Sequence, residues 1–119
     1  MKGESYKNLI VWQKAMDLVI AIYRIVASFP KEEIYGLSSQ IKRAAVSIPS
    51  NIAEGSRRSS RKDFRNFLLI AFGSGSELET QLEIAERLSF VQKSDLVLAE
   101  NPSSEIMKMI NKLSDSMNT

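Results

Sequence analysis

The sequence contains no cysteine and no histidine among its 119 residues. Without thiols there can be no disulfide, no thiolate-bound metal and no cysteine nucleophile. Without imidazole, every catalytic dyad or triad built on histidine is excluded, together with the Glu-x-x-His di-iron pattern of many helical bundles. The sequence therefore predicts a protein that is not an enzyme, with no catalytic residues, no bound metal and no cofactor.

Long hydrophobic runs are also missing. The longest runs, Leu18–Tyr23 and Phe67–Phe72, are far shorter than the roughly 20 residues that a membrane-spanning helix needs. The opening residues, MKGESYKNL, lack the apolar core of a signal peptide. Together with an ordinary composition, 44% hydrophobic and 25% charged, these features predict one globular cytoplasmic domain with no membrane partner.

Charge is small overall but unevenly distributed. The net charge of +2 is the sum of +1 for residues 1–41 (five basic, four acidic), +5 for residues 42–65 (seven basic, two acidic) and −4 for residues 77–119 (four basic, eight acidic). Much of the positive surplus lies where one predicted helix ends and the next begins. We call this cluster the basic junction; it consists of Arg57, Arg58, Arg61, Lys62 and Arg65.

Apolar residues recur at the three- and four-residue spacing of a helix, and no segment alternates as a strand would. Residues 8–29 carry two such stripes. We expect the first to face the core, and it consists of Leu9, Trp12, Met16, Val19, Tyr23 and Val26. The second is expected to need a partner, and it consists of Val11, Ala15, Leu18, Ile22, Ile25 and Phe29.

An oligomer interface follows from this apolar excess. The block Phe67–Phe72 is apolar around the whole helix, and exposing several bulky side chains would leave a sticky monomer. A homo-oligomer held by the first and third helices is therefore predicted. Its interface residues are expected to be Phe67, Leu69, Ile70, Phe72, Val11, Leu18 and Ile22.

Further helices are predicted over residues 37–55, 60–89 and 94–117, which gives an all-α, up-down antiparallel four-helix bundle. Pro49 should kink or loosen the second helix, and Asn101-Pro102 should break or restart the fourth. Ser60 and Asp63 form a capping-box pattern at the start of the third. The core stripe of that third helix is predicted to be Phe64, Leu68, Ala71, Gly75, Leu78, Leu82 and Ala85.

Three segments, VWQKAMDLV, IKRAAVSIPSNIAEGSRR and FLLIAFGSGSELETQLEIA, resemble the four-helix-bundle proteins encoded in intervening sequences of bacterial 23S rRNA genes. They are also similar to the accessory variability proteins of diversity-generating retroelements. The resemblance covers roughly residues 6–90 and is most specific in SIPSNIAEG and GSGSELE. It implies a bundle that assembles into a ring-like homopentamer with a basic surface for nucleic acid. It attaches no enzymatic activity, and the cellular role of the family is largely unknown.

The basic junction has three interpretations. Its arginines could be a solvated surface that caps the second helix, where cations contribute about 0.3–1 kcal/mol. However, Arg61, Lys62 and Arg65 lie in the first turns of the third helix, where positive charge opposes the helix dipole. Arg61 and Arg65 also share a face. We expect contact with phosphate or nucleic acid; a plain surface and contact with an acidic protein patch are the alternatives.

Other polar features are typical of structural roles. The run Gly73–Ser76 lacks the strand and lysine of a phosphate-binding loop, so it predicts close helix packing. Glu54 is expected to pair with Arg43, Arg57 or Arg58, since no catalytic partner is visible. A solvated face, and not a metal site, is predicted for Glu77, Glu79, Glu83 and Glu86.

Two functional hypotheses follow. In the first, a non-enzymatic oligomer binds RNA or DNA through the basic junction without strong sequence specificity. In the second, the protein is an interaction scaffold that recruits a partner protein, and its charge only steers the encounter. The salt dependence of nucleic-acid binding separates the two, because phosphate contacts release counterions.

Overall fold

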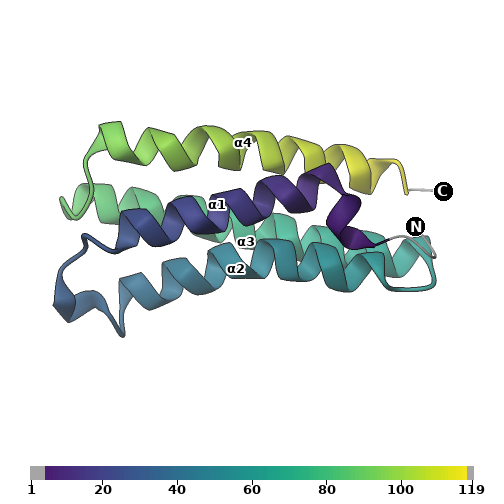
Figure 1. Ribbon diagram of the computed structural model, residues 1–119, viewed down its shortest axis with the longest axis horizontal. Coiled ribbons are helices and arrows are strands. Elements are labelled where there is room, and N and C mark those ends of the chain that lie inside the picture. Colours follow the sequence, from purple (N-terminus) through teal and green to yellow (C-terminus); the bar gives the residue numbers. More distant parts are fainter. Residues whose placement is uncertain (1–4, 118–119) are drawn as a thin grey trace.

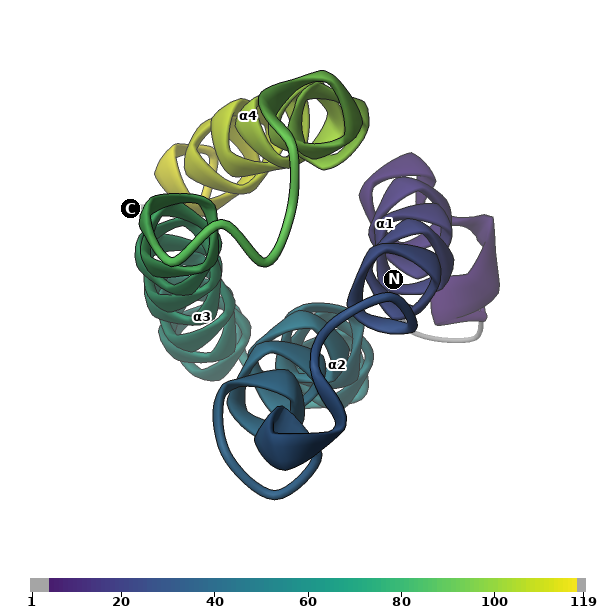
Figure 2. The ribbon, with the colours of Figure 1, turned by 90° about the vertical axis from the view of Figure 1, so that its left-hand side faces the viewer.

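The amphipathic segments fold as four antiparallel helices (Figure 1), and the computed structural model describes residues 5–117. The helices are α1 (Ile10–Val26), α2 (Leu37–Ser56), α3 (Arg61–Arg87) and α4 (Lys93–Asp115), with short 3-10 segments η1 (Tyr6–Asn8) and η2 (Lys31–Glu33). Each helix contacts the next, and α4 returns to contact α1, so the four enclose one core (Figure 2). Within the described range there is no strand, and no helix is long and apolar enough to cross a membrane.

The start of α3 has the predicted cap. Ser60 lies in an extended conformation, and its Oγ accepts a hydrogen bond from the backbone N–H of Asp63 at 3.1 Å. This contact satisfies one of the free donors of the first turn. Helix α1 ends at Val26, three residues before the predicted end, and Pro30 lacks the backbone N–H that would bond the Val26 carbonyl in a longer helix.

The predicted core stripe of α3 is confirmed. Spacings of four and three place one face of this helix against α2 and α4. All seven predicted residues of that face are buried, namely Phe64, Leu68, Ala71, Gly75, Leu78, Leu82 and Ala85. This stripe and the buried side chains of the other helices form one core cluster.

The two stripes of α1 are exchanged relative to the prediction. Val11, Leu18 and Ile22 are only 4%, 1% and 0% exposed within the protomer, so they cannot reach a second copy while the bundle is intact. Assigning these three side chains to an oligomer interface was therefore wrong. Most of the other stripe lies at the edge of the core, where Met16 and Tyr23 are exposed, whereas its last member, Val26, is buried. Aromatic and thioether side chains tolerate such an edge, since their polar or polarisable atoms can face water.

Neither internal proline ends its helix. α2 continues through Pro49, and α4 is continuous from Lys93 to Asp115 with Pro102 inside it, so the predicted break at Asn101-Pro102 was wrong. A proline frees the carbonyl four residues before it. For Pro102 this carbonyl belongs to Leu98, whose side chain is 66% exposed. Water can replace the lost hydrogen bond on this face, so the helix persists.

Small and polar residues bring α2 and α3 together. Ser47 Oγ and Ser74 Oγ lie 2.7 Å apart across the two helices, and Asn51 Nδ2 donates to both the backbone oxygen and Oγ of Ser47. A Cβ added at Gly75 would collide with the side chain of Met107 on α4. The close packing predicted for Gly73–Ser76 is therefore present at Ser74 and Gly75.

Candidate nucleic-acid interface

The basic junction lies where α2 ends and α3 begins, at the end of the bundle that also holds η1 and the last turn of α4 (Figure 1). Gly55 sets the geometry of this turn. A Cβ built on Gly55 would lie 2.6 Å from Phe67 Cβ and 2.9 Å from Phe64 Cδ1. The last turn of α2 thus packs directly on the first turns of α3, which holds the cations from both helices at one end.

Gly55→Ala is expected to destabilise the fold by about 1–3 kcal/mol, because the new methyl group overpacks against a β-carbon that cannot move without its helix. Urea unfolding followed by circular dichroism measures the change. Gly73→Ala is the control, since nothing lies within 4 Å of a Cβ at that position. A Gly55→Ala variant as stable as the wild type would contradict this account of the turn.

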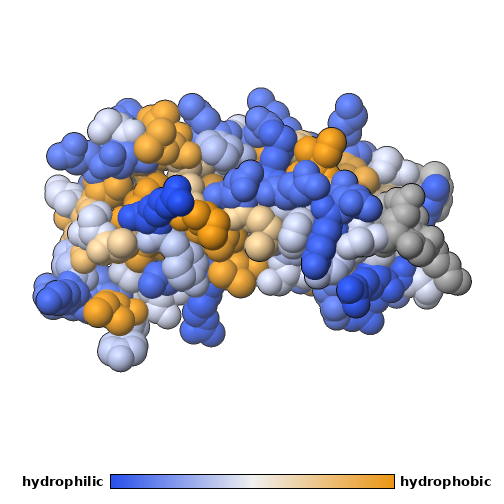
Figure 3. Space-filling model, viewed as in Figure 1, coloured by the Kyte–Doolittle hydropathy of each residue, from blue (hydrophilic) through white to orange (hydrophobic). Residues whose placement is uncertain are grey.

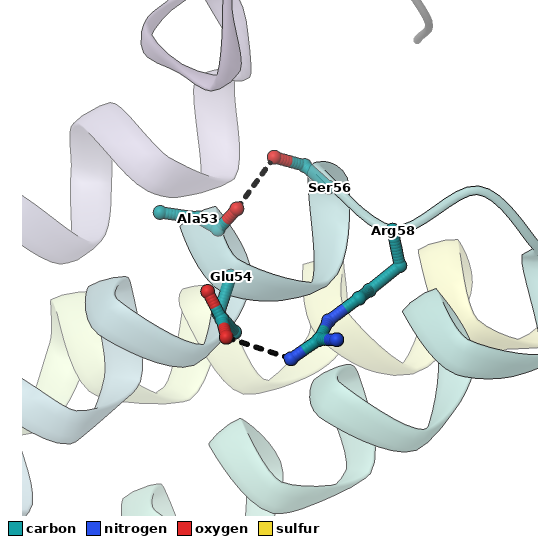
Figure 4. A network of polar contacts seen from close by, with 4 residues as sticks. All are labelled: Ala53, Glu54, Ser56 and Arg58. Carbon is teal, nitrogen blue, oxygen red and sulfur yellow. Dashed lines mark hydrogen bonds and ion pairs between the residues drawn. The ribbon is translucent and has the colours of Figure 1, made fainter.

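Two arginines of the junction stack on aromatic rings. The Arg57 guanidinium lies 5.1 Å from the centre of the Tyr6 ring, and that of Arg58 lies 4.8 Å from the centre of the Phe67 ring. Arg58 also donates to Glu54 at 2.7 Å, one turn earlier on α2 (Figure 4). The ion pair predicted for Glu54 is confirmed with Arg58 as its partner. Stacking on a ring face leaves the in-plane N–H groups of a guanidinium free to donate.

The three cations of α3 differ in burial. Arg61 and Lys62 are exposed, whereas Arg65 is half-buried. The Nε of Arg65 is buried and has no hydrogen-bond partner among residues 5–117. Within that same range, Arg58 is the one member of the junction that pairs with a carboxylate. Four closely spaced cations thus remain without an acidic partner in the described part of the chain.

Sequence reasoning did not identify Tyr6 and Phe67 as parts of this site. Tyr6 is 51 positions before Arg57 (57 − 6) and precedes the first helix, so no periodic pattern connects them. Phe67 was assigned to an oligomer interface from its apolar neighbourhood alone. One signal in the sequence could have identified both rings. Aromatic residues and arginines occur at helix ends that antiparallel packing brings together.

The apolar outer side of α3 lies next to the junction. Leu69 and Ile70 are 43% and 52% exposed, while Phe67 and Phe72 are half-buried. Gly73 follows Ile70 on this side and has open space around it. We call Leu69, Ile70 and Gly73 the α3 outer face. A glycine inside a helix costs about 1 kcal/mol relative to alanine, and no contact within the protomer explains the one at position 73.

Three glutamates of α3 make polar contacts with neighbouring side chains. Glu83 pairs with Arg87, Glu77 accepts from Gln81 Nε2, and Glu79 accepts from Ser103 Oγ at 3.4 Å. No group of three acidic side chains that could hold a metal ion occurs in the described residues. The arrangement at the junction is suited to holding anions by charge and N–H donation.

By its fold and its basic junction, the protein is an antiparallel four-helix bundle with a cationic end. The sequence model of the 23S rRNA-intervening sequence protein family matches residues 7–112, and the chain belongs to this family. Among solved structures, it is similar to a protein of unknown function from the S23 ribosomal protein family of Bacteroides thetaiotaomicron. The two are 29% identical with a TM-score of 0.79, over 88% of this chain and 98% of that chain. No curated protein matches the sequence.

Proposed function

We propose that this protein is a non-enzymatic, cytoplasmic homo-oligomer that binds RNA or DNA through the phosphates at its basic junction. The observation that carries the proposal is the set of four cations that have no carboxylate partner in the described chain, namely Arg57, Arg61, Lys62 and Arg65. Cations that serve only solubility are stabilised by acidic side chains nearby. Here they are concentrated at one end, and the first turns of α3 add the positive end of a helix dipole.

Aromatic stacking favours this function over a plain surface. The rings of Tyr6 and Phe67 hold the guanidinium groups of Arg57 and Arg58 in place, so these groups do not depend on acidic side chains alone. An ordered guanidinium loses less conformational freedom when it binds a phosphate, and it can present two N–H groups to one anion. Contacts of this kind fix position on a nucleic acid but carry no sequence information. We therefore expect weak sequence preference.

Assembly would multiply these contacts. The α3 outer face leaves Leu69 and Ile70 exposed beside an unexplained glycine, which supports a contact with a second copy of the chain. A ring of copies, a pentamer by resemblance to the family, would repeat the junction around one surface. Repetition converts individually weak phosphate contacts into useful avidity.

The dependence of binding on salt tests the proposal. If one protomer neutralises five phosphates, log Kd should rise with log salt by about 3.5 on a single strand (five times about 0.7) and by about 4.5 on a duplex (five times about 0.9). Fluorescence anisotropy of labelled RNA and DNA between 50 and 200 mM salt measures the slope. No binding to either nucleic acid at the lowest salt would contradict the proposal and favour the alternative, a scaffold that recruits a partner protein.

A further inference from the structure

A groove of about 340 Å³ runs between α1 and α2 and reaches the basic junction. Its lining is mostly apolar, and Figure 3 shows hydrophobic surface between these two helices with hydrophilic side chains around it. This volume is in the range of small-ligand sites. The groove is lined by residues of η1, α1 and α2, including Tyr6, Trp12, Met16, Val46, Pro49 and Ala53.

Packing of the core does not account for this surface. Met16 and Val46 are each 39% exposed. Tyr6 and Trp12 meet edge to face, with ring centres 5.2 Å apart, and both remain partly accessible. Two aromatic rings at the wall of an open groove provide a flat, apolar contact for another planar ring.

Cations border the groove at both ends. Arg57 lies over Tyr6, which lines one end of the groove, and Lys42 lies beyond the other end, one turn before Val46 and 4.9 Å from the centre of the Tyr23 ring. The two cations are fifteen positions apart along α2 and its C-cap (57 − 42), or about 22 Å at about 1.5 Å per residue. The acid closest to Arg57 in sequence, Glu54, is already paired with Arg58. An occupant of this groove should therefore be negatively charged along its length and carry flat apolar rings.

We propose that the groove binds a single-stranded segment of RNA or DNA several nucleotides long, with a base against Trp12 and Tyr6 and backbone phosphates on Arg57 and Lys42. The inference rests on the proposed function and specifies its ligand, since a duplex keeps its bases stacked inside and would use the junction alone. Stacking on aromatic rings is tolerant of sequence, because every base has a π-face. Ser50 Oγ on the wall already donates to the Val46 carbonyl, and the Tyr6 hydroxyl and the Trp12 indole N–H are the other polar side-chain groups of the lining. This leaves little for base-specific readout.

Trp12 is the sole tryptophan of the chain, so its fluorescence reports directly on the groove. A 12-nucleotide single strand of deoxyadenosine, its abasic counterpart and the corresponding duplex are titrated at 50 mM salt, with anisotropy measured in parallel. The base-bearing strand should quench Trp12 and bind about 5- to 150-fold more tightly for each stacked base than the abasic strand. The abasic strand and the duplex should bind through the junction without quenching.

Ala53→Leu fills the groove beside Tyr6 without removing any charge, and Ser50→Leu is a second filling variant at an exposed position. Either should abolish the advantage of the base-bearing strand while the abasic strand binds as before. Ala21→Leu is the matched control, because it places the same side chain in a groove of about 350 Å³ between α1 and α4. Circular dichroism checks that all three variants keep their helices.

The possible failures are distinct. If neither strand binds, the proposed function is wrong and the groove inference is wrong with it. If both strands bind equally well without quenching, or if the filled variants keep the advantage of the bases, the groove inference alone is wrong. A filled variant that loses its oligomeric state but still binds the base-bearing strand with full advantage would identify the groove as a contact between protein copies.

Discussion

Replacing Arg57, Arg58, Arg61, Lys62 and Arg65 together with glutamine is expected to weaken binding of RNA and DNA by more than about 1,000-fold at low salt. Each charged group that hydrogen-bonds a phosphate contributes about 1.5–3 kcal/mol, so three such contacts per protomer reach this loss even at the lower value. The salt slope should fall toward zero, since few counterions would be released. Anisotropy across a salt series measures both quantities.

The glutamine variant should remain folded. Arg58 and Glu54 are about half exposed, with side chains 44% and 53% accessible, and a solvent-screened pair of this kind contributes at most about 1 kcal/mol. The two cation–π contacts add about 0.5–1 kcal/mol each at exposed sites. The summed loss of about 1–3 kcal/mol is smaller than the typical stability of a domain. A helical circular dichroism spectrum with a lowered Tm is the expected result.

A matched control separates the junction from overall charge. Glutamine at five exposed cations in the other half of the bundle removes the same charge from a different place; these cations are Arg24, Lys31, Arg43, Arg87 and Lys93. We expect this control to keep most of the affinity and most of the salt slope. If both variants lose binding equally, the affinity comes from net charge and the junction is not a site.

The sequence predicts the helices and much of the core for a physical reason. Where a helix has one apolar stripe, as α3 does over most of its length, the spacing alone determines which face is buried. Helix α1 has two stripes, and the spacing cannot rank them. Side-chain shape ranks them instead, since the buried stripe contains the small Ala15 and branched aliphatic residues, whereas the other contains Trp12 and Tyr23. Such a choice depends on the facing helices and is not local to α1.

The candidate site is predictable in part for a similar reason. Its cations are clustered in the sequence, so composition reveals them. The aromatic partner of Arg57 is distant in the sequence, because Tyr6 reaches Arg57 only after α1 and α2 pack antiparallel. The groove beside them arises from the same packing and from the stripe of α1 that stays at the surface. Local patterns thus identify charge, whereas the surface that accompanies the charge depends on the tertiary fold.

Ile70→Glu is expected to convert the oligomer into monomers. Ile70 is 52% exposed and Leu69 is 43% exposed, and burying a side chain of this size is worth about 1.5–3 kcal/mol at each contact. A charge at position 70 removes that gain and adds the cost of desolvating a carboxylate. Light scattering at micromolar concentration measures the mass. The same substitution at Leu98, which is 66% exposed on α4, is the control and should leave the mass unchanged.

Gly73→Ala also tests the α3 outer face. We expect this substitution to stabilise the protomer and to weaken the assembly. Within one protomer the new methyl group meets nothing within 4 Å, so it should stabilise α3 by about 1 kcal/mol through helix propensity alone. In the assembly the methyl group would lie where the backbone of a neighbouring copy approaches. The variant oligomer should therefore dissociate at a higher protein concentration than the wild-type oligomer does. A variant that gains stability and keeps its assembly would place the contact elsewhere on the protein. A wild-type chain that is monomeric at micromolar concentration would exclude the contact altogether, and glycine at position 73 would then weaken α3 with no compensating contact.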